Sequence, residues 1–151
     1  MVDTGDGIYR YENVSTARAQ GIDLEVEGRE PGGWQWRSSL SLSDLSTPGA
    51  TAVNSPRWLT KGHVVKPVGE DWSLGCQWLA MASREGLRQK VPSLLTVDAV
   101  IRRQLAPGHS LALVVRNLLD RDNQDPASSD NDLLRIPLPG RSVTLEWRGQ
   151  F

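Results

Sequence analysis

The chain has 151 residues, a formal net charge of −1 and charged residues of both signs interspersed along it. This length suits a single domain, and the charge pattern excludes a basic nucleic-acid-binding surface and an acidic tail. Cys76 is the only cysteine, so no disulfide framework or cysteine-based zinc site is expected. We interpret it as a small apolar residue of a strand.

The N-terminal segment has neither a basic region nor an apolar stretch, so we expect no signal peptide here. The longest apolar runs, such as residues 111–115, are far shorter than the roughly 20 residues that a membrane helix needs. Hydropathy alone therefore suggests a soluble protein. That inference fails for β-barrels, because their lipid-facing residues alternate with polar ones.

Apolar and polar residues alternate with a period of two along most of the chain, which is typical of β-strands. Near the start, Ile22, Leu24 and Val26 fall on one face of a predicted strand and their acidic neighbours fall on the other. The apolar and polar residues of the last strand are divided in the same way. Strand ends read from sequence are uncertain by about 2–4 residues. The pattern predicts a partial strand at Ile8–Tyr11 and strands at 16–28, 33–44, 58–67, 71–83, 93–105, 109–118 and 141–151.

The connections between these strands alternate between short and long. The short ones are 29–32, 68–70 and 106–108, and the long ones are 45–57, 84–92 and 119–140. An up-and-down barrel with tight periplasmic turns and longer extracellular loops has this alternation. We therefore predict an all-β fold: an antiparallel up-and-down meander of seven to eight strands that forms part of a transmembrane β-barrel.

The composition of the faces favours a membrane barrel over an ordinary half-buried sheet. The polar faces carry serines and charged residues, which suit a hydrated lumen. Trp34, Trp72 and Phe151 are expected at the short-turn rim and Trp58 at the opposite rim, as in aromatic belts. Five arginines either line the lumen or pair with acidic residues of neighbouring strands: Arg18, Arg37, Arg102, Arg116 and Arg148, with Asp23, Glu25 and Glu146 as partners.

Several short segments resemble the closing section of TonB-dependent outer-membrane receptors. Residues 17–25, which contain Gly21, resemble a strand of that family, and residues 91–99 resemble a later one. Pro56 and Arg57 lie in a segment similar to one that enters a strand after an extracellular loop. Asn117, Leu118, Leu119 and Asp120 resemble the family's Asn-Leu-Phe-Asp segment, with Leu119 in place of Phe, and Gly140 and Arg141 precede the last strand.

These residues have readable structural roles. Gly140 is expected to relieve strain where the last long loop re-enters the sheet, and Asn117 and Asp120 to bond backbone groups as a strand leaves the barrel. The end of the last strand resembles the β-signal that the outer-membrane barrel assembly machinery recognises. Its residues are Val143, Leu145, Trp147 and Phe151, and Gly149 stands where a hydrophobic residue is more common.

The resemblance implies that residues 1–151 are the C-terminal segment of a barrel of about 22 strands, located in the bacterial outer membrane. A plug domain and an energy-coupling segment are absent from the chain, so we expect it to be a fragment that does not transport alone. The implied function of the parent is uptake of a scarce chelate, ferric siderophore-like or cobalamin-like. The implied partners are outer-membrane lipid, the barrel assembly machinery and, only through the parent's plug, the energy-coupling protein TonB.

No enzyme, cofactor or resident metal is expected. His63 and His109 fall in different segments, and the Gly-x-Ser-x-Gly motif of a nucleophilic serine is missing. An acidic group in the last long loop suits either a solvated loop or calcium, although it lacks the EF-hand spacing. Its residues are Asp120, Asp122, Asp125, Asp130 and Asp132.

Two other functions stay open. A small self-contained outer-membrane barrel with a structural or adhesive role needs eight strands. The partial strand at Ile8–Tyr11 is shorter than the 9–11 residues that span a bilayer. A soluble ligand-binding β-barrel or sandwich predicts folding without detergent. No residue can be assigned to ligand binding from the sequence.

Overall fold

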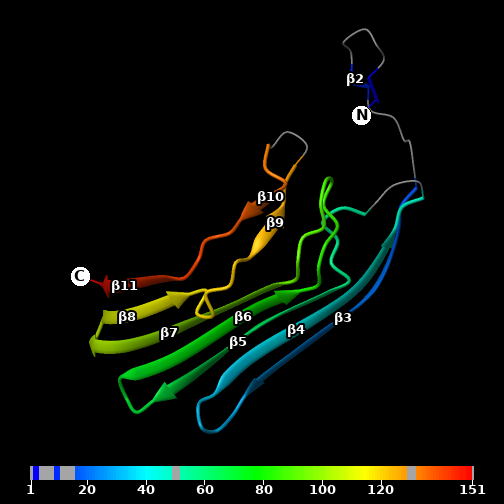
Figure 1. Ribbon diagram of the computed structural model, residues 1–151. Coiled ribbons are helices and arrows are strands. Elements are labelled where there is room, and N and C mark those ends of the chain that lie inside the picture. The colour runs from blue at the N-terminus through cyan, green and yellow to red at the C-terminus, as the bar shows by residue number, and fades with distance from the viewer. Residues whose placement is uncertain (1, 4–8, 11–15, 49–51, 129–131, 151) are drawn as a thin grey trace.

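The computed structural model describes residues 2–3, 9–10, 16–48, 52–128 and 132–150. Seven strands form one antiparallel sheet in the order β11-β8-β7-β6-β5-β4-β3 (Figure 1). No helix long and apolar enough to cross a membrane is present in this described part. The strands are β3 (Arg18–Arg29), β4 (Gln35–Ser46), β5 (Trp58–Val68), β6 (Trp72–Met81), β7 (Leu94–Ala106), β8 (His109–Arg116) and β11 (Ser142–Gly149).

This sheet confirms the predicted all-β meander, and each strand ends within two residues of its predicted bounds. The partial strand is the exception to the predicted arrangement. Its counterpart β2 (Tyr9–Arg10) pairs with β1 (Val2–Asp3) in a separate two-stranded sheet. Ile8 and Tyr11, the two ends of the predicted strand, lie outside the described residues, and the main sheet has seven strands.

The two ends of the sheet differ in the length of their connections (Figure 1). Three short turns lie at one end, and each contains a glycine with positive φ, which a residue with a side chain adopts only at a cost: Gly33, Gly69 and Gly108. The long connections 47–57, 82–93 and 117–141 lie at the other end. The predicted alternation is therefore confirmed, and the ends are called the short-turn rim and the long-loop rim below.

The last long connection carries a hairpin that the sequence pattern did not predict. Strands β9 (Gln124–Pro126) and β10 (Arg135–Pro137) pair antiparallel within it. An isolated antiparallel bridge between Arg84 and Val91 also brings the two arms of the β6–β7 connection together. Strands of three residues are too short to give a period-two signal, which explains why they were missed.

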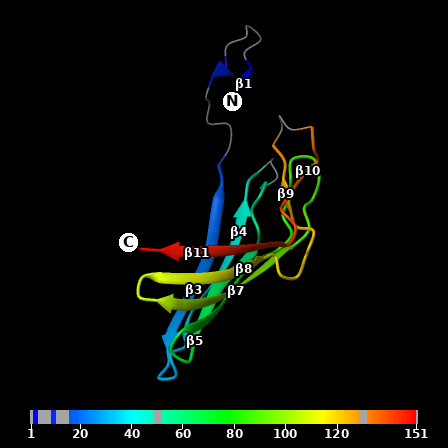
Figure 2. The ribbon, with the colours of Figure 1, turned by 90° about the vertical axis from the view of Figure 1, so that its left-hand side faces the viewer.

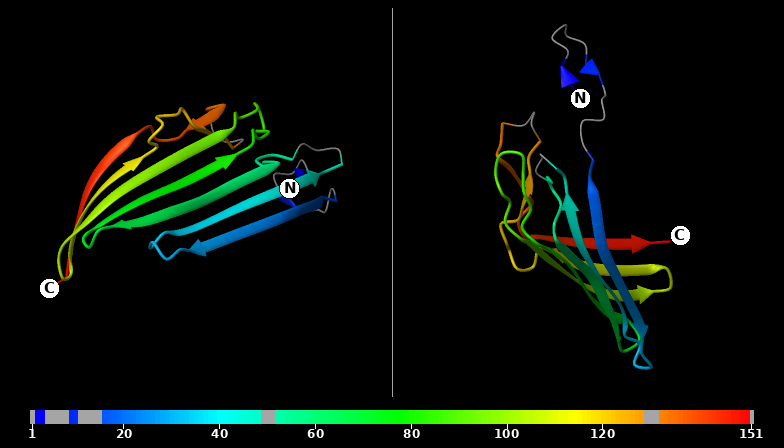
Figure 3. Two further views of the ribbon diagram at one scale, coloured as in Figure 1. Left: turned by 90° about the horizontal axis from the view of Figure 1, so that it is seen from below. Right: turned by 90° about the vertical axis from the view of Figure 1, so that its right-hand side faces the viewer.

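The seven-stranded sheet is a curved, twisted wall (Figures 2 and 3). β3 and β11 lie at opposite edges, and each has one neighbour in the sheet. Their outer backbone groups are therefore unpaired within this sheet. Exposed edges of this length invite further strand pairing.

Cross-strand register divides the side chains between two faces, because opposed residues in antiparallel strands point the same way. Ile22 opposes Leu42, which opposes Trp58, and this row is apolar. Three residues further along β3, Glu25 opposes Ser39, which opposes Lys61, and this row is polar. The apolar face carries Ile22, Leu24, Val26, Trp36, Leu40, Leu42, Trp58, Trp72, Leu74, Trp78, Val97, Ile101, Leu111, Leu113, Val143, Leu145 and Trp147.

The apolar face is left uncovered. Ile22 is 70% exposed and Leu145 67% exposed, and the described residues bury only four hydrophobic side chains, Val91, Leu94, Ala112 and Ala127. A large apolar side chain gains about 1.5–3 kcal/mol when it leaves water. A face of this kind is stable only when lipid or protein covers it.

Candidate functional site

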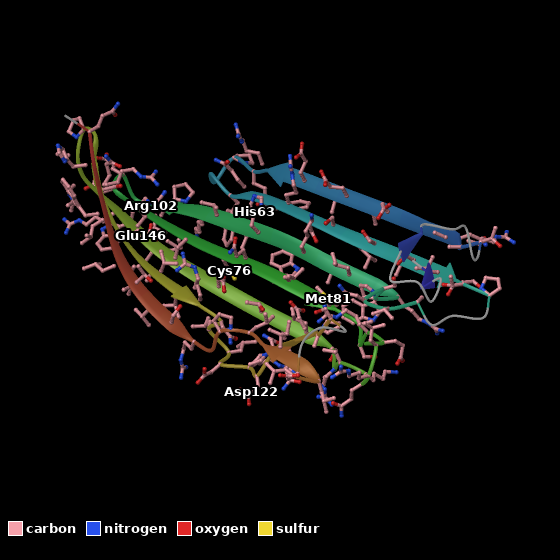
Figure 4. The ribbon with its side chains drawn as sticks, turned by 90° about the horizontal axis from the view of Figure 1, so that it is seen from above. His63, Cys76, Met81, Arg102, Asp122 and Glu146 are labelled. Carbon is pink, nitrogen blue, oxygen red and sulfur yellow. The ribbon has the colours of Figure 1, made fainter. Side chains whose placement is uncertain are left out.

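The polar face has a row of charged and polar side chains that runs from the short-turn ends of β3 and β4 to the middle of β5, β6 and β7. Register places Glu27, Arg37, His63, Gln77 and Asp98 opposite one another across β3 to β7. Arg37 Nε donates to Glu27 Oε2 over 3.0 Å, and Gln77 Nε2 donates to Asp98 Oδ2 over 2.8 Å. Figure 4 shows His63 near the middle of the sheet. The row forms a polar surface suited to water or to another polar surface.

An open hollow of about 500 Å³ lies on this face. Arg37 neutralises part of the negative charge in the hollow, because it also lies 3.8 Å from Glu25. Lys61 and His63 have no carboxylate partner among the described residues. The hollow therefore offers basic groups beside hydroxyls and the carboxylates of Glu25 and Asp98. Its polar lining consists of Glu25, Arg37, Ser39, Lys61, His63, Gln77, Thr96 and Asp98.

A second hollow follows on the same face toward the short-turn rim. It is lined in part by Arg102, Arg116 and Glu146, and Arg116 lies 4.0 Å from Glu146. Arg102 and Glu146 lie toward this rim in Figure 4. Arg37 and Arg116 face the polar side and pair with acidic residues, which is the second of the two predicted alternatives.

Arg18 does not face the polar side as predicted. In the regular β3–β4 register, Arg18 opposes Ser46 and has the same parity as Ile22 and Leu24. It therefore lies on the apolar side at the long-loop rim. A charged side chain close to a strand end can reach water from the apolar face.

A buried arginine joins the three long connections at the long-loop rim. Arg84 is 4% exposed, and its Nη1 lies 2.9 Å from Asp125 Oδ1 and donates to Asn54 Oδ1 over 3.1 Å. Its Nη2 donates to the Gln124 carbonyl oxygen over 2.9 Å. Because these partners come from two other loops, Arg84 fixes the loops to one another. The sequence does not mark Arg84 as important: it is a charged residue directly after the predicted strand 71–83.

The Asn117–Asp120 segment forms a second polar group at this rim, in which only Asn117 is buried. Asn117 is 3% exposed and has φ 48°, and Asp120 has φ 52°. The Asn117 backbone N–H donates to Asp98 Oδ1 over 2.8 Å, and its side chain donates to the Arg121 carbonyl oxygen over 2.9 Å. Asp120 accepts from the Arg141 backbone N–H and side chain, both over 3.0 Å. The predicted backbone-bonding role is present for both residues.

The other residues of the family-like segments lie at strand ends or close approaches. A Cβ at Gly21 would lie 2.6 Å from the Leu42 carbonyl oxygen, so only glycine fits there. Ser43 donates to the carbonyl oxygens of Pro56 and Arg57, over 3.0 Å each, which attaches the loop end to β4. Gly140 has no positive φ, and positive φ occurs at Asn117 and Asp120 instead. The role expected of Gly140 is therefore not seen, and Asn117 and Asp120 are residue types that tolerate a positive φ. Leu118 and Leu119, the apolar pair of this turn, are 41% and 51% exposed.

The residues weighed for catalysis or metal binding are not brought together. His109 stacks on Trp147 with ring centroids 5.9 Å apart, far along the sheet from His63. No cluster of three metal-ligating side chains occurs in the part of the chain that the structure describes. Asp125 pairs with Arg84 and Asp120 with Arg141, and Asp130 lies outside the described residues.

The terminal strand places the β-signal residues on one face. Val143, Leu145 and Trp147 are 62%, 67% and 58% exposed on the apolar face. Trp34 and Trp72 lie at the short-turn rim, as predicted, and Trp58 opens β5 at the long-loop rim. Phe151 lies outside the described residues. Recognition of this strand by the assembly machinery stays a prediction.

The curved sheet with one apolar and one polar face is similar to known outer-membrane barrels. The family model of the TonB dependent receptor-like β-barrel matches residues 1–118. The chain belongs to this family. Its members are non-enzymatic transporters of the bacterial outer membrane, and the predicted family, location and lack of enzymatic activity are confirmed.

Solved structures agree on the fold. The closed form of the ferric-catecholate import receptor Fiu from E. coli K12 matches 91% of this chain with a TM-score of 0.76 and 17% identity. The copper transporter OprC matches 89% of it with a TM-score of 0.69 and 19% identity. This chain spans 21% and 24% of the length of those two proteins. No curated protein sequence matches it.

Proposed function

We propose that residues 1–151 form the C-terminal segment of the barrel of an outer-membrane receptor for a scarce chelate, and that this segment does not transport alone. The observation that carries the proposal is the pair of unlike faces on one curved sheet. Exposed Ile22 and Leu145 suit lipid, and the hollow around Lys61 and His63 suits a hydrated lumen.

The edges of the sheet support a larger barrel. Inside a bilayer, unpaired backbone groups cost several kcal/mol each. β3 and β11 would both expose such groups, so both need neighbouring strands. The sheet's similarity to about a fifth to a quarter of each matched structure agrees with this requirement. Such a parent would also supply the plug through which TonB acts.

The polar face supports a choice among the possible classes of cargo. Fiu is described as a ferric-catecholate receptor and OprC as a copper transporter, and both cargoes contain a metal. A cation without an acidic partner attracts anions, and Lys61 provides one in the hollow. We therefore favour an anionic metal chelate of the ferric siderophore class over cobalamin-like cargo or free copper.

The test is an uptake assay with the full-length receptor that contains this segment, produced in cells without other receptors. Labelled ferric catecholate, cobalamin and copper are offered separately, with and without TonB. We expect TonB-dependent uptake of the ferric chelate, slower by about tenfold for Lys61→Glu because reversing one charge changes attraction by roughly 1–2 kcal/mol. Lys61→Arg keeps the charge and should transport normally. Uptake of none of the three cargoes would contradict the proposal.

The alternative functions receive less support. A soluble barrel must bury its apolar face, and the described residues leave that face exposed. A self-contained eight-stranded barrel needs an eighth long strand, and within the described residues β2 pairs with β1 alone.

A further inference from the structure

A row of aromatic and basic side chains crosses the apolar face at the short-turn rim. Register places Val68, Trp72, Arg103, Leu111 and Trp147 opposite one another across five strands, so their side chains share one face at one height. Trp34 and Lys66 extend the row toward β4. We call this row the short-turn belt: Trp34, Lys66, Trp72, Arg103, His109 and Trp147.

Each tryptophan of the belt contacts a basic side chain. Lys66 Nζ lies 4.8 Å from the centre of the Trp34 ring, and the Arg103 guanidinium lies 5.3 Å from that of Trp72. The His109 and Trp147 rings stack at 23°. Cation–π contacts of this kind hold a charge at a defined place beside an apolar surface.

The two cations of the belt are not neutralised by the protein. Neither Lys66 nor Arg103 forms an ion pair within the described residues, whereas Arg37, Arg84, Arg116 and Arg141 all do. Glu70 and Asp71 lie in the adjacent turn but pair with neither of them. Positive charge therefore remains available on the face that lipid covers.

The depth of the belt decides which partner suits it. Tryptophans of a barrel lie at the level of the lipid headgroups, and long basic side chains keep their stems in the apolar layer while the charge reaches that level. Valine and leucine neighbours, Val68 and Leu111, complete an apolar surface for acyl chains. The chemistry that complements this arrangement is a phosphodiester whose negative charge has no cation of its own.

We propose that the short-turn belt binds acidic phospholipids of the adjacent leaflet, with Lys66 and Arg103 contacting the phosphate. The inference rests on the outer-membrane location of the family and not on the identity of any cargo. Failure of the uptake experiment would therefore leave it intact. A zwitterionic phospholipid binds less well because its own amine competes with the two side chains.

The test uses the full-length receptor in detergent, titrated with phosphatidylglycerol or phosphatidylcholine and followed by native mass spectrometry. The unchanged receptor should bind phosphatidylglycerol more tightly. The combined substitution Lys66→Gln and Arg103→Gln should weaken phosphatidylglycerol binding by about fivefold for each cation removed and leave phosphatidylcholine binding unchanged.

The control removes two charges from the same rim but from the polar face, as Arg102→Gln with Arg148→Gln. It should keep the preference for phosphatidylglycerol. Arg103→Lys, which retains the charge, should restore binding that Arg103→Gln loses, and this pair serves if the double variant fails to fold. Equal binding of both lipids by the unchanged receptor, or an equal loss in the polar-face control, would overturn the proposal.

Discussion

The two faces of the sheet are built from the same strands but differ in what can stabilise them. On the apolar face, Ile22 and Leu145 are largely exposed, and only lipid or protein can cover them favourably. On the polar face, Glu27, Arg37 and Asp98 bond to neighbouring side chains and border an open hollow. Successive side chains of a strand face opposite sides of the sheet, so a shift of one residue along the strand moves a side chain from the lipid side to the water side.

The largest expected effect comes from placing a charge on the apolar face. Leu40→Arg in the full-length barrel in lipid vesicles should lower the free energy of unfolding by about 2–4 kcal/mol, since arginine must leave water near the middle of the bilayer. Ser39→Arg is the matched control, because Ser39 faces the polar side opposite Glu25. Denaturant unfolding measures both, and equal losses would show that the faces are not distinct.

The second-largest effect is expected at Asn117, whose backbone N–H bonds to Asp98 on the polar face. Asn117→Ala removes bonds to Arg121 and places alanine at positive φ. It should destabilise the barrel by about 2 kcal/mol. Asn117→Gly should recover about 1 kcal/mol, because glycine adopts this φ without strain. If alanine and glycine prove equally destabilising in thermal unfolding, backbone strain has no part in the effect.

The smallest effect is expected within the polar face itself. Arg37→Gln breaks ion pairs with Glu25 and Glu27 that are largely exposed to water, and such pairs contribute little. The free energy of unfolding should fall by less than for either preceding variant. The loss should be smaller still at high salt, because ions screen exposed charges. A loss as large as that of Leu40→Arg would mean that this face is dry.

The sequence predicted the parts of the fold that repeat. Period two located the seven strands and their faces, and Gly and Pro located the turns, because these signals are local. Arg84 joins residues 30 and 40 positions away, and no local pattern predicts such contacts. Arg18 was misplaced even though the period of two along β3 gives it the parity of Ile22 and Leu24. The stacking of His109 on Trp147 likewise depends on the β8–β11 pairing.

The most direct measurement of the central claim is oxygen accessibility along β3. Single spin labels from residue 22 to residue 27 are introduced into the full-length receptor in lipid, with Cys76 replaced by serine. Oxygen dissolves in lipid, so we expect high accessibility at Ile22, Leu24 and Val26. We expect low accessibility at Asp23, Glu25 and Glu27. Uniform accessibility along the strand, or maxima at the acidic positions, would contradict a barrel wall with lipid on its apolar face.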